Sequence, residues 1–195
     1  MKMTILLKGT AWILNHGLKK QGVDCSKVYQ EYQDIIQRAD DIGEHNTLLG
    51  AYGLAAYFIA MHRFTGFDDD ENFLIIEKAL KNSKLYAMMM GNEDSYFSEK
   101  AMERRRNWSK ETYKRKYKSD WVVDFIEKSD KYEFGFDYHE CGVCKLCQQE
   151  NCMEIARYLC KLDYMTVDLM GIGLDRTKTL ANGDDICDFR FKRLK

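Results

Sequence analysis

The strongest constraint on this fold is one apolar stretch, Leu48 to Met61, with the sequence LLGAYGLAAYFIAM. Its length of about fourteen residues is well short of the ~20 that a helix needs to cross a bilayer. Polar residues flank it, His45 and Asn46 before it and His62 and Arg63 after it. A helix that is apolar all round belongs in the interior of a protein. The stretch therefore predicts a buried central helix and no transmembrane segment.

Helical periodicity predicts further helices up to about residue 118. Apolar residues recur on one helix face over Thr4 to Lys20, Val28 to Ile36 and Phe73 to Tyr86. The acidic run Asp68 to Glu71 precedes the last of these, where carboxylates favour the positive end of the helix dipole. We interpret this run as a helix cap. A calcium loop is the alternative, but the spaced oxygen ligands, central glycine and distal glutamate of an EF-hand are missing.

The segment from Ser98 to Lys118 is strongly basic and carries the aromatic residues Trp108 and Tyr113 among its cations. Such a mixture can stack on nucleobases, and a basic rim for an anionic small molecule is another alternative. Glu111 and Arg115 have the i,i+4 spacing of a helix, however, so we predict a solvated helix. The chain has 30 basic and 31 acidic residues, and its net charge of -1 creates no field toward nucleic acid or an anionic membrane.

After Ser119 the apolar pattern changes to the period of two that is typical of strands. A helical stretch from about Val143 to Met170 interrupts it, with a predicted break at Asn151, where Asn151 and Glu154 are spaced as an N-cap and its N3 partner. Gly171 and Gly173 would end this stretch. Polar turns join the predicted strands into two hairpins. The four strands are Trp121 to Ile126, Tyr132 to His139, Leu174 to Thr179 and Ile186 to Phe191.

These elements predict an α+β fold, in which an N-terminal helical bundle packs with a C-terminal antiparallel sheet of β-β-α-β-β order. The expected division is a helical region over residues 1–118 and an α+β region over residues 119–195. No repeat or low-complexity linker separates the two regions. We therefore expect one continuous globular unit.

The chain has seven cysteines and no proline. The opening MKMTILLKG is broken by Lys8 and lacks the pattern of an export signal. An odd number of cysteines without such a signal predicts reduced thiols and a cytoplasmic location. Five of the seven lie within one twenty-residue window: Cys141, Cys144, Cys147, Cys152 and Cys160.

The first four of these cysteines have the spacing C-x2-C-x2-C-x4-C, which could bind zinc or an iron-sulfur cluster. A bacterial ferredoxin has a shorter last spacing followed by proline, and a zinc ribbon needs a second, distant pair. If residues 143–150 are helical, i,i+3,i+6 spacing spreads the sulfurs around the helix. We predict no metal and no cofactor, and keep a thiolate metal protein as an alternative.

A carboxylate stands in an apolar stripe of the predicted helix. Cys160 and Asp163 are three residues apart and share a helix face. The same face carries Ala156, Val167 and Met170. Because burial of a lone carboxylate is costly or raises its pKa, Asp163 needs a partner or a function. The alternatives are a functional site and a structural ion pair with a strand arginine, either Arg176 or Arg190.

The last hairpin places one set of side chains on each face. Simple closure of its turn brings Thr177 opposite Asp188 and puts Arg176 on the same face as Cys187. A slip of one residue would exchange the faces, so the sequence leaves open which group Arg176 meets. Cysteine next to phenylalanine is often a small core residue, which is the alternative to a nucleophile at Cys187. Its face also carries Phe189 and Phe191.

Three separate pieces of the C-terminal region form a specific pattern: Cys141, then CKLD over Cys160 to Asp163, then RTKTLANGDDICDFRF over Arg176 to Phe191. This pattern resembles the L-2-amino-thiazoline-4-carboxylic acid hydrolase family, whose motif is a cysteine, C-x-x-D, R-T-x-T-[LI]-A-x-G and C-D-F-R. The resemblance covers about residues 120–193 and is only general over the helices. Cys144, Cys147 and Cys152 have no counterpart in it. The matching positions are Cys141, Cys160, Asp163, Arg176, Thr177, Thr179, Gly183, Cys187, Asp188 and Phe189.

The resemblance implies a hydrolase that opens a small carboxylated thiazoline, or a related heterocycle, to a carbamoyl-cysteine. Arg176 would hold the substrate carboxylate in a bidentate fork. Asp163 or Asp188 would activate water or protonate the ring. Cys160 or Cys187 would be the nucleophile if a cation lowers its pKa. The implied catalytic residues are Cys160, Asp163, Cys187 and Asp188, and the implied substrate-binding residues are Arg176, Thr177, Thr179 and Cys141.

The expected partner is a small-molecule substrate with a carboxylate, with neither nucleic acid nor membrane, and self-association into a homo-oligomer is left open. Two other functions are compatible with the sequence. One is a module that senses a small acid in the same pocket without turning it over, and the other is the thiolate metal protein. Convergence of the motif residues on one site would favour the enzyme, whereas their dispersal through the core would indicate packing.

Overall fold

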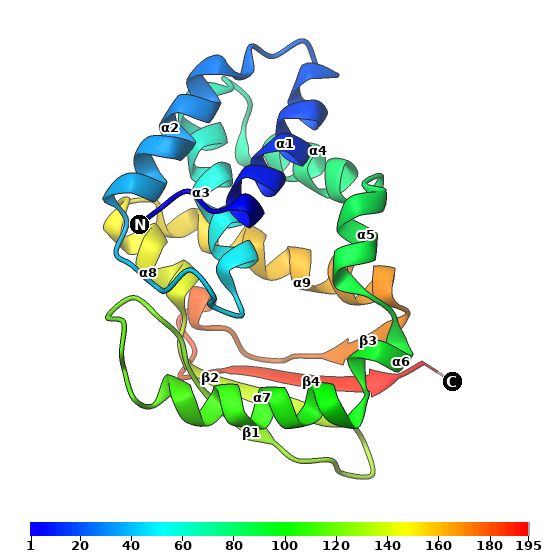
Figure 1. Cartoon of the computed structure of the whole chain (residues 1–195). Coiled ribbons are helices and arrows are strands. Elements are labelled where there is room, and N and C mark those ends of the chain that lie inside the picture. Colours follow the sequence, from blue (N-terminus) through cyan, green and yellow to red (C-terminus); the bar gives the residue numbers. More distant parts are fainter. Residues whose placement is uncertain (195) are drawn as a thin grey trace.

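The structure is a computed structural model that describes residues 1–194, with helices in the N-terminal part and a four-stranded sheet in the C-terminal part (Figure 1). This arrangement confirms the predicted α+β fold. The helices are α1 (Ile5–Lys19), α2 (Cys25–Arg38), α3 (Leu49–Phe64), α4 (Asp69–Lys81), α5 (Lys84–Met90), α6 (Glu93–Tyr96), α7 (Glu99–Thr112), α8 (Gly142–Gln149) and α9 (Ala156–Met170). The strands are β1 (Val122–Ile126), β2 (Phe134–Glu140), β3 (Ile172–Asp175) and β4 (Cys187–Arg193), and η1 (Met153–Ile155) and η2 (Leu180–Asn182) are 3₁₀ turns.

The predicted buried helix is α3, which lies at the centre of the helical part (Figure 1). It packs against α1, α2, α4, α8 and α9. Gly53 permits a close approach, because a Cβ atom there would lie 2.6 Å from a methyl group of Leu7 on α1. The hydroxyl of Tyr32, which is fully buried, donates to the backbone oxygen of Leu7 over 2.9 Å. Within residues 1–194, no helix is long and apolar enough to cross a membrane.

The acidic run before α4 is a helix cap, as predicted. Asp68 is the N-cap residue, and its carboxylate accepts from the backbone N–H of Glu71 over 2.8 Å. The Glu71 carboxylate accepts in turn from the backbone N–H of Asp68 over 3.1 Å. This reciprocal capping box satisfies two backbone donors that the first turn of a helix leaves without partners.

The basic segment forms α7, but the helix ends at Thr112 instead of continuing to residue 118. Arg115 has a φ angle of +49°, which a continuing helix does not allow. The helical pairing of Glu111 with Arg115 was therefore a wrong prediction. Glu111 accepts from Lys114, and Arg115 pairs with Glu140 at the end of β2.

The sheet has the order β1-β2-β4-β3, and all three neighbouring pairs are antiparallel. Both predicted hairpins are present, and pairing of β2 with β4 joins them. Asp175 pairs with Arg190 as simple closure requires, so the slipped register does not occur. The strand β3 is nevertheless shorter than predicted, because the N–H groups of Thr177 and Lys178 donate to the carboxylate of Asp188 instead of to strand backbone.

One face of the sheet is apolar and aromatic and the other is polar. Cross-strand partners on the apolar face include Phe136 with Phe189 and Tyr138 with Cys187. Helix α7 packs against β1 and helix α9 packs against β3. Met102 of α7 and Val167 and Met170 of α9 share one hydrophobic core with the apolar face of the sheet. The polar face carries charged residues such as Arg190, whose guanidinium donates to Asp137 over 2.7 Å.

The predicted break in the C-terminal helical stretch separates α8 from α9. Asn151 has a φ angle of +55°, a left-handed conformation that asparagine tolerates, and it ends the α8 segment. Cys152, and not Asn151, is the N-cap of η1, and it makes no side-chain cap, so the predicted capping by Asn151 was wrong. Gly171 ends α9 with a φ angle of +73°, as predicted, whereas Gly173 lies within β3.

A charge cluster ties the end of α8 to the N-terminal helices. Glu150 is 7% exposed and accepts hydrogen bonds from Arg38 of α2 at 2.9 and 2.6 Å and from Arg63 of α3 at 2.8 Å. Arg63 also donates to the backbone oxygen of Glu150 over 2.8 Å. Both arginines donate to Glu31 as well. A buried carboxylate with this many charged donors is satisfied, but loss of the carboxylate would leave two cations without their buried partner.

We expect Glu150→Ala to lower the free energy of unfolding by about 3 kcal/mol, because removal of one partner from a buried ion pair leaves the other uncompensated. The matched control is Glu127→Ala, which removes the exposed carboxylate that Arg106 contacts at 2.8 Å and should cost less than about 1 kcal/mol. Urea denaturation of the two variants provides the comparison. Equal losses in both variants would contradict a structural role for the buried cluster.

Candidate functional site

The site is organised around an ion pair between α9 and the residue that follows β3. One terminal nitrogen of Arg176 donates to Oδ2 of Asp163 over 2.6 Å, and the other donates to the backbone oxygen of Cys160 over 2.8 Å. The guanidinium lies between the rings of Tyr164, at 4.9 Å, and Phe189, at 4.8 Å. Of the two arginines proposed from the sequence as partners of Asp163, the structure therefore selects Arg176.

The loop after Arg176 is held by other residues of the motif. Both carboxylate oxygens of Asp188 accept hydrogen bonds, from the backbone N–H and hydroxyl of Thr177 at 2.8 and 2.6 Å and from Lys178 at 2.6 Å. Partial burial works against ionisation, but these hydrogen bonds lower the pKa of Asp188. Gly183 has a φ angle of +89°, which permits the turn that closes the loop. Asp188 thus clamps the loop, and both of its oxygens are occupied.

The Asp163 carboxylate combines access with desolvation. Its side chain keeps 41% of its surface accessible. Burial nevertheless raises the pKa of Asp163 to about 6, against the effect of Arg176, which lowers it. Together these properties describe a carboxylate with accessible surface that is surrounded mainly by protein and not by bulk solvent. A group of this kind can accept and donate a proton near neutral pH.

Cys141 has the environment of a reactive thiol. It follows β2 directly and is the N-cap residue of α8. The thiol of Cys144 and the backbone N–H groups of Val143 and Cys144 lower the pKa of the Cys141 thiol, although burial opposes them. Gly142 allows this packing, because a Cβ atom there would lie 2.8 Å from the ring of Trp121. Helix N-termini stabilise thiolates in this way.

The other two motif cysteines have the opposite environment. Burial, followed by the charge of Asp163, raises the pKa of the Cys160 thiol to about 12. Burial raises the pKa of the Cys187 thiol to about 11, and its sulfur accepts from the backbone N–H of Leu180 over 3.2 Å. Both are therefore protonated thiols at neutral pH. The pKa shifts therefore disfavour Cys160 and Cys187, the two nucleophiles expected from the sequence. They favour Cys141, for which a binding role was expected.

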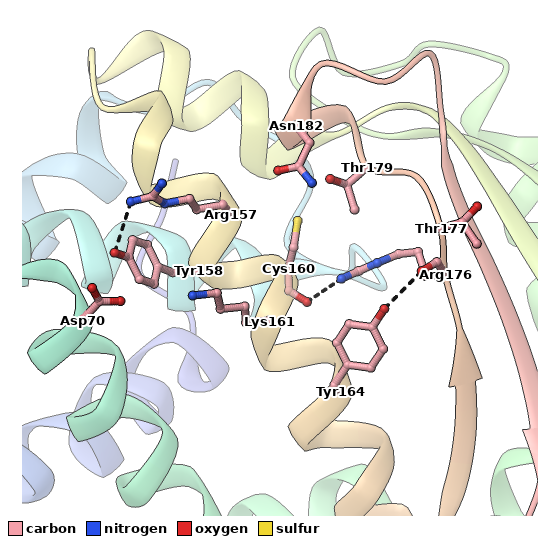
Figure 2. A pocket seen from close by; sticks show the side chains of 10 residues that line it. All are labelled: Asp70, Arg157, Tyr158, Cys160, Lys161, Tyr164, Arg176, Thr177, Thr179 and Asn182. Carbon is pink, nitrogen blue, oxygen red and sulfur yellow. Dashed lines mark hydrogen bonds between the residues drawn. The ribbon is translucent and has the colours of Figure 1, made fainter.

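A cleft of about 580 Å³ opens beside this group, on the outer side of α9 (Figure 2). Figure 2 shows the Cys160 thiol directed toward the side chains of Thr179 and Asn182, while Arg176 reaches toward the Cys160 backbone. Asp163 does not line this cleft. The residues that do are Asp70, Arg157, Tyr158, Cys160, Lys161, Tyr164, Arg176, Thr177, Thr179 and Asn182.

The cleft is cationic and contains an unsatisfied hydroxyl. Arg157 donates to the hydroxyl of Tyr158 over 3.3 Å, and Lys161 lies 4.8 Å from the centre of the same ring. Neither cation forms an ion pair within the described part of the chain. Thr179 is 7% exposed, and its buried hydroxyl oxygen has no hydrogen-bond partner. Such a group is costly to leave unpaired and marks a place where a ligand could supply the bond.

The structure thus brings Cys141, Cys160, Asp163, Arg176 and Cys187 into one neighbourhood, in which the charge of Asp163 acts on all three thiols. Thr177 and Thr179 line the adjoining cleft. Asp188 has a structural role instead, because its carboxylate binds Thr177 and Lys178 in the loop after β3.

Two tyrosines belong to the same neighbourhood and were missed in the sequence analysis. Burial is the main reason that the pKa of Tyr96 rises to about 12, and the charge of Asp163 adds to it. Burial also raises the pKa of Tyr138, with contributions from Tyr96 and Asp163. The alternation of Tyr138 with Phe134 and Phe136 could have revealed its inward direction. Nothing local indicates Tyr96, which lies more than sixty residues before Asp163.

The cysteine cluster is divided between different environments. Cys144 and Cys147 lie within α8, and the sulfur of Cys152 donates to the backbone oxygen of Cys147 over 3.7 Å. Among residues 1–194, no group of three or more His, Cys, Asp or Glu side chains is placed to hold a metal ion.

Comparison with known proteins identifies one family. The model of the family described as L-2-amino-thiazoline-4-carboxylic acid hydrolase matches residues 46–191, which is well over half of the chain. The match includes every motif position as well as helices α3 to α7. No curated protein and no solved structure matches the chain.

The raised pKa of Asp163 predicts how stability depends on pH. The native state binds a proton more tightly at this group than the unfolded chain does, so ionisation of Asp163 destabilises the fold. The stability of the wild type relative to Asp163→Asn should therefore decrease as pH rises from about 4 to about 6, and then stay level. Urea denaturation of both proteins across this range measures the difference. If the stability of the wild type relative to Asp163→Asn instead increases with pH, Arg176 holds the pKa of Asp163 below its ordinary value.

Proposed function

The chain belongs to the L-2-amino-thiazoline-4-carboxylic acid hydrolase family, and from this premise we propose that it opens a small carboxylated thiazoline, or a closely related cyclic amidine, to a carbamoyl-cysteine. The observation that carries this proposal is the accessible carboxylate of Asp163, with its pKa of about 6, which accepts from Arg176 and whose charge acts on the Cys141 thiol. Ring opening needs a proton donor for the departing atom and a nucleophile for the ring carbon. Both are present in one neighbourhood.

The reaction consumes one water and breaks one ring bond. The Cys141 thiolate adds to the carbon between the ring nitrogen and sulfur, and the bond to one of these two atoms then breaks. Asp163 supplies the proton to the atom that leaves. Water replaces the thiolate at the same carbon, which restores Cys141 and leaves the carbamoyl group of the product. The alternative route, in which Asp163 activates water for direct attack, uses the same proton balance without the covalent step.

Arg176 is a positioning residue in this scheme. Its hydrogen bonds to Asp163 and to the Cys160 backbone fix the carboxylate relative to α9. Its positive charge also limits how far burial raises the pKa of Asp163. Because Asp163 and Cys160 already occupy its two terminal nitrogens, Arg176 is less suited to hold the substrate carboxylate than the sequence analysis expected.

The direct test is turnover of 2-amino-thiazoline-4-carboxylate by the purified protein, with carbamoyl-cysteine detected by mass spectrometry. Asp163→Asn and Cys141→Ser should each lower kcat by roughly 100-fold or more, because they remove the proton donor and the nucleophile. The matched controls are Asp168→Asn, on an exposed position of the same helix, and Cys25→Ser, at the start of the remote helix α2. Wild-type rates in Asp163→Asn would overturn the assignment, and wild-type rates in Cys141→Ser would favour the route by activated water.

Arg176→Gln provides a readout that a purely structural role would not affect. Removal of the guanidinium charge raises the pKa of Asp163 further. The inflection of kcat/KM with pH should then move to a higher pH in the variant. An unmoved inflection would indicate that a group other than Asp163 titrates in the reaction.

The unpaired cations of the cleft favour a second function, the binding of a small acid without turnover. Arg157, Lys161 and the unpartnered hydroxyl of Thr179 would provide charge and a hydrogen bond for a carboxylate. In this case, 2-amino-thiazoline-4-carboxylate raises the melting temperature of the protein, and mass spectrometry finds no product. Lys161→Met should abolish the shift, whereas Lys178→Met, whose amine pairs with Asp185 outside the cleft, should keep it. Formation of product would exclude this function.

A further inference from the structure

One partly buried cation on the apolar side of the sheet, Arg105, has no role in the proposed reaction. Arg105 is part of the basic run of α7, but it stands on the helix face that is directed inward. The buried residues of this face are Ala101, Met102, Ser109 and Thr112. The spacing of Arg105 from Ala101 and Ser109 is four residues in each direction, which places it in the same stripe. It therefore differs from its exposed neighbour Arg104.

The guanidinium of Arg105 is packed on aromatic rings. Its Cζ atom lies 4.0 Å from the centre of the Tyr96 ring and 4.9 Å from that of Phe134. One terminal nitrogen donates to the backbone oxygen of Tyr96 over 2.6 Å and lies 4.0 Å from the sulfur of Met102. These contacts hold the side chain in place and leave other N–H groups available.

Arg105 forms no ion pair with any residue that the structure describes. Its neighbour Arg106, in contrast, forms two ion pairs, with the carboxylates of Glu127 at 2.8 Å and Glu99 at 3.3 Å. Burial lowers the pKa of Arg105, which reflects the cost of its charge at this position. Buried cations are normally paired, because the protein interior does not replace the hydration that they lose. The missing counter-charge is therefore the feature that needs an explanation.

The rings beneath Arg105 connect it to the reaction site. The ring of Tyr96 lies 5.5 Å from that of Phe191, which lies 5.9 Å from that of Phe189, on which Arg176 packs. Arg105, on α7, and Arg176, in the loop after β3, thus pack on rings of one connected aromatic layer. Asp163 is close enough to Tyr96 for its charge to act on that hydroxyl.

The polar side chains around this layer keep part of their surface accessible. Tyr96, Arg105, Tyr138 and Asp163 are all only partly buried, although each is packed among interior residues. Asp163 keeps 41% of its side-chain surface accessible and does not line the cleft of Figure 2. A small ring placed at this accessible surface would meet Asp163 and the sheet aromatics together.

We propose that Arg105 binds the carboxylate of the small acid whose ring reacts at Asp163, and so supplies the anion site that the paired Arg176 does not. This assignment rests on the proposed function for the identity of the ring, but the anion site itself follows from the unpaired guanidinium. Arginine is suited to the role, because its planar fork presents parallel N–H groups to the two oxygens of a carboxylate. The ligand completes the charge pair that the fold leaves open.

The first experiment compares two substrates that differ only in the carboxylate, 2-amino-thiazoline-4-carboxylate and 2-amino-thiazoline. Arg105→Met should lower kcat/KM for the carboxylated substrate on the order of 100-fold, as expected for loss of charge-assisted hydrogen bonds. For 2-amino-thiazoline the same variant should match the wild type. Arg104→Met is the matched control and should leave both substrates unchanged. Equal losses for both substrates would overturn the assignment.

The second experiment does not depend on turnover. L-thiazolidine-4-carboxylate has the carboxylate and a saturated ring without the amidine, so its binding can be followed by isothermal titration calorimetry. The wild type and Arg104→Met should bind it alike, and Arg105→Met should bind on the order of 100-fold more weakly. If the wild type binds this probe through Arg105 but turns nothing over, the proposed reaction fails and the anion site stands. Equal affinity in Arg105→Met, or no binding by the wild type, would overturn the site.

Urea denaturation and a second variant test whether Arg105→Met is correctly folded. Because methionine fills much of the same volume without a buried charge, Arg105→Met should have an unfolding midpoint at least as high as the wild type. If this variant does not fold, Arg105→Lys decides the question, since it keeps the charge and lacks the planar fork. Arg105→Lys should bind L-thiazolidine-4-carboxylate roughly 10-fold more weakly than the wild type. Unchanged affinity in Arg105→Lys would contradict recognition by the fork.

Discussion

The apolar face of the sheet is the constraint on which the rest of the C-terminal part depends. Aromatic residues from β2 and β4 fill it, with ring centres of Phe134 and Phe191 4.9 Å apart and those of Tyr138 and Phe189 5.1 Å apart. Such a face must be covered, because exposing an aromatic surface of this size to water is unfavourable and promotes aggregation. Helix α9 covers it next to β3, and α7 covers it next to β1. Two polar groups reach this interior on the covering helices, Asp163 on α9 and Arg105 on α7.

Burial gives identical side chains different chemistry in this molecule. Three motif cysteines lie near one carboxylate, yet the pKa of Cys141 is lowered while those of Cys160 and Cys187 are raised. The difference arises from the donors around each sulfur, because the Cys144 thiol and the backbone N–H groups of Cys144 and Val143 favour the Cys141 thiolate, whereas burial dominates at the other two. The same logic separates the two aspartates. Asp163 is desolvated beside one cation, whereas Asp188 receives three hydrogen bonds and is held in its ionised form.

Features set by local sequence could be predicted, and features set by register or by distant contacts could not. The all-round apolar composition of α3 and the acidic cap at Asp68 depend on neighbouring residues alone, and both predictions are confirmed. The need of Asp163 for a partner also followed from its apolar stripe. The choice of Arg176 over Arg190 did not, because it depends on which face of a strand each side chain takes. Arg105 was concealed for a different reason: the surrounding basic run suggested a solvated surface, and only tertiary packing identifies its inward face.

The motif residues hold the reactive carboxylate in place, whereas a residue outside the motif recognises the substrate in the proposed reaction. The motif residues around Arg176 mostly stabilise one another, since Thr177 is bound by Asp188, Gly183 closes the turn and Arg176 is bound to Asp163. A set of residues so fully paired can hold a reactive carboxylate in place, but it has few donors left for a substrate. Recognition must then come from groups that the motif does not include. An unpaired guanidinium on α7, packed on the rings of Tyr96 and Phe134, provides such a group, so that the chemistry and the choice of anion are carried by different helices.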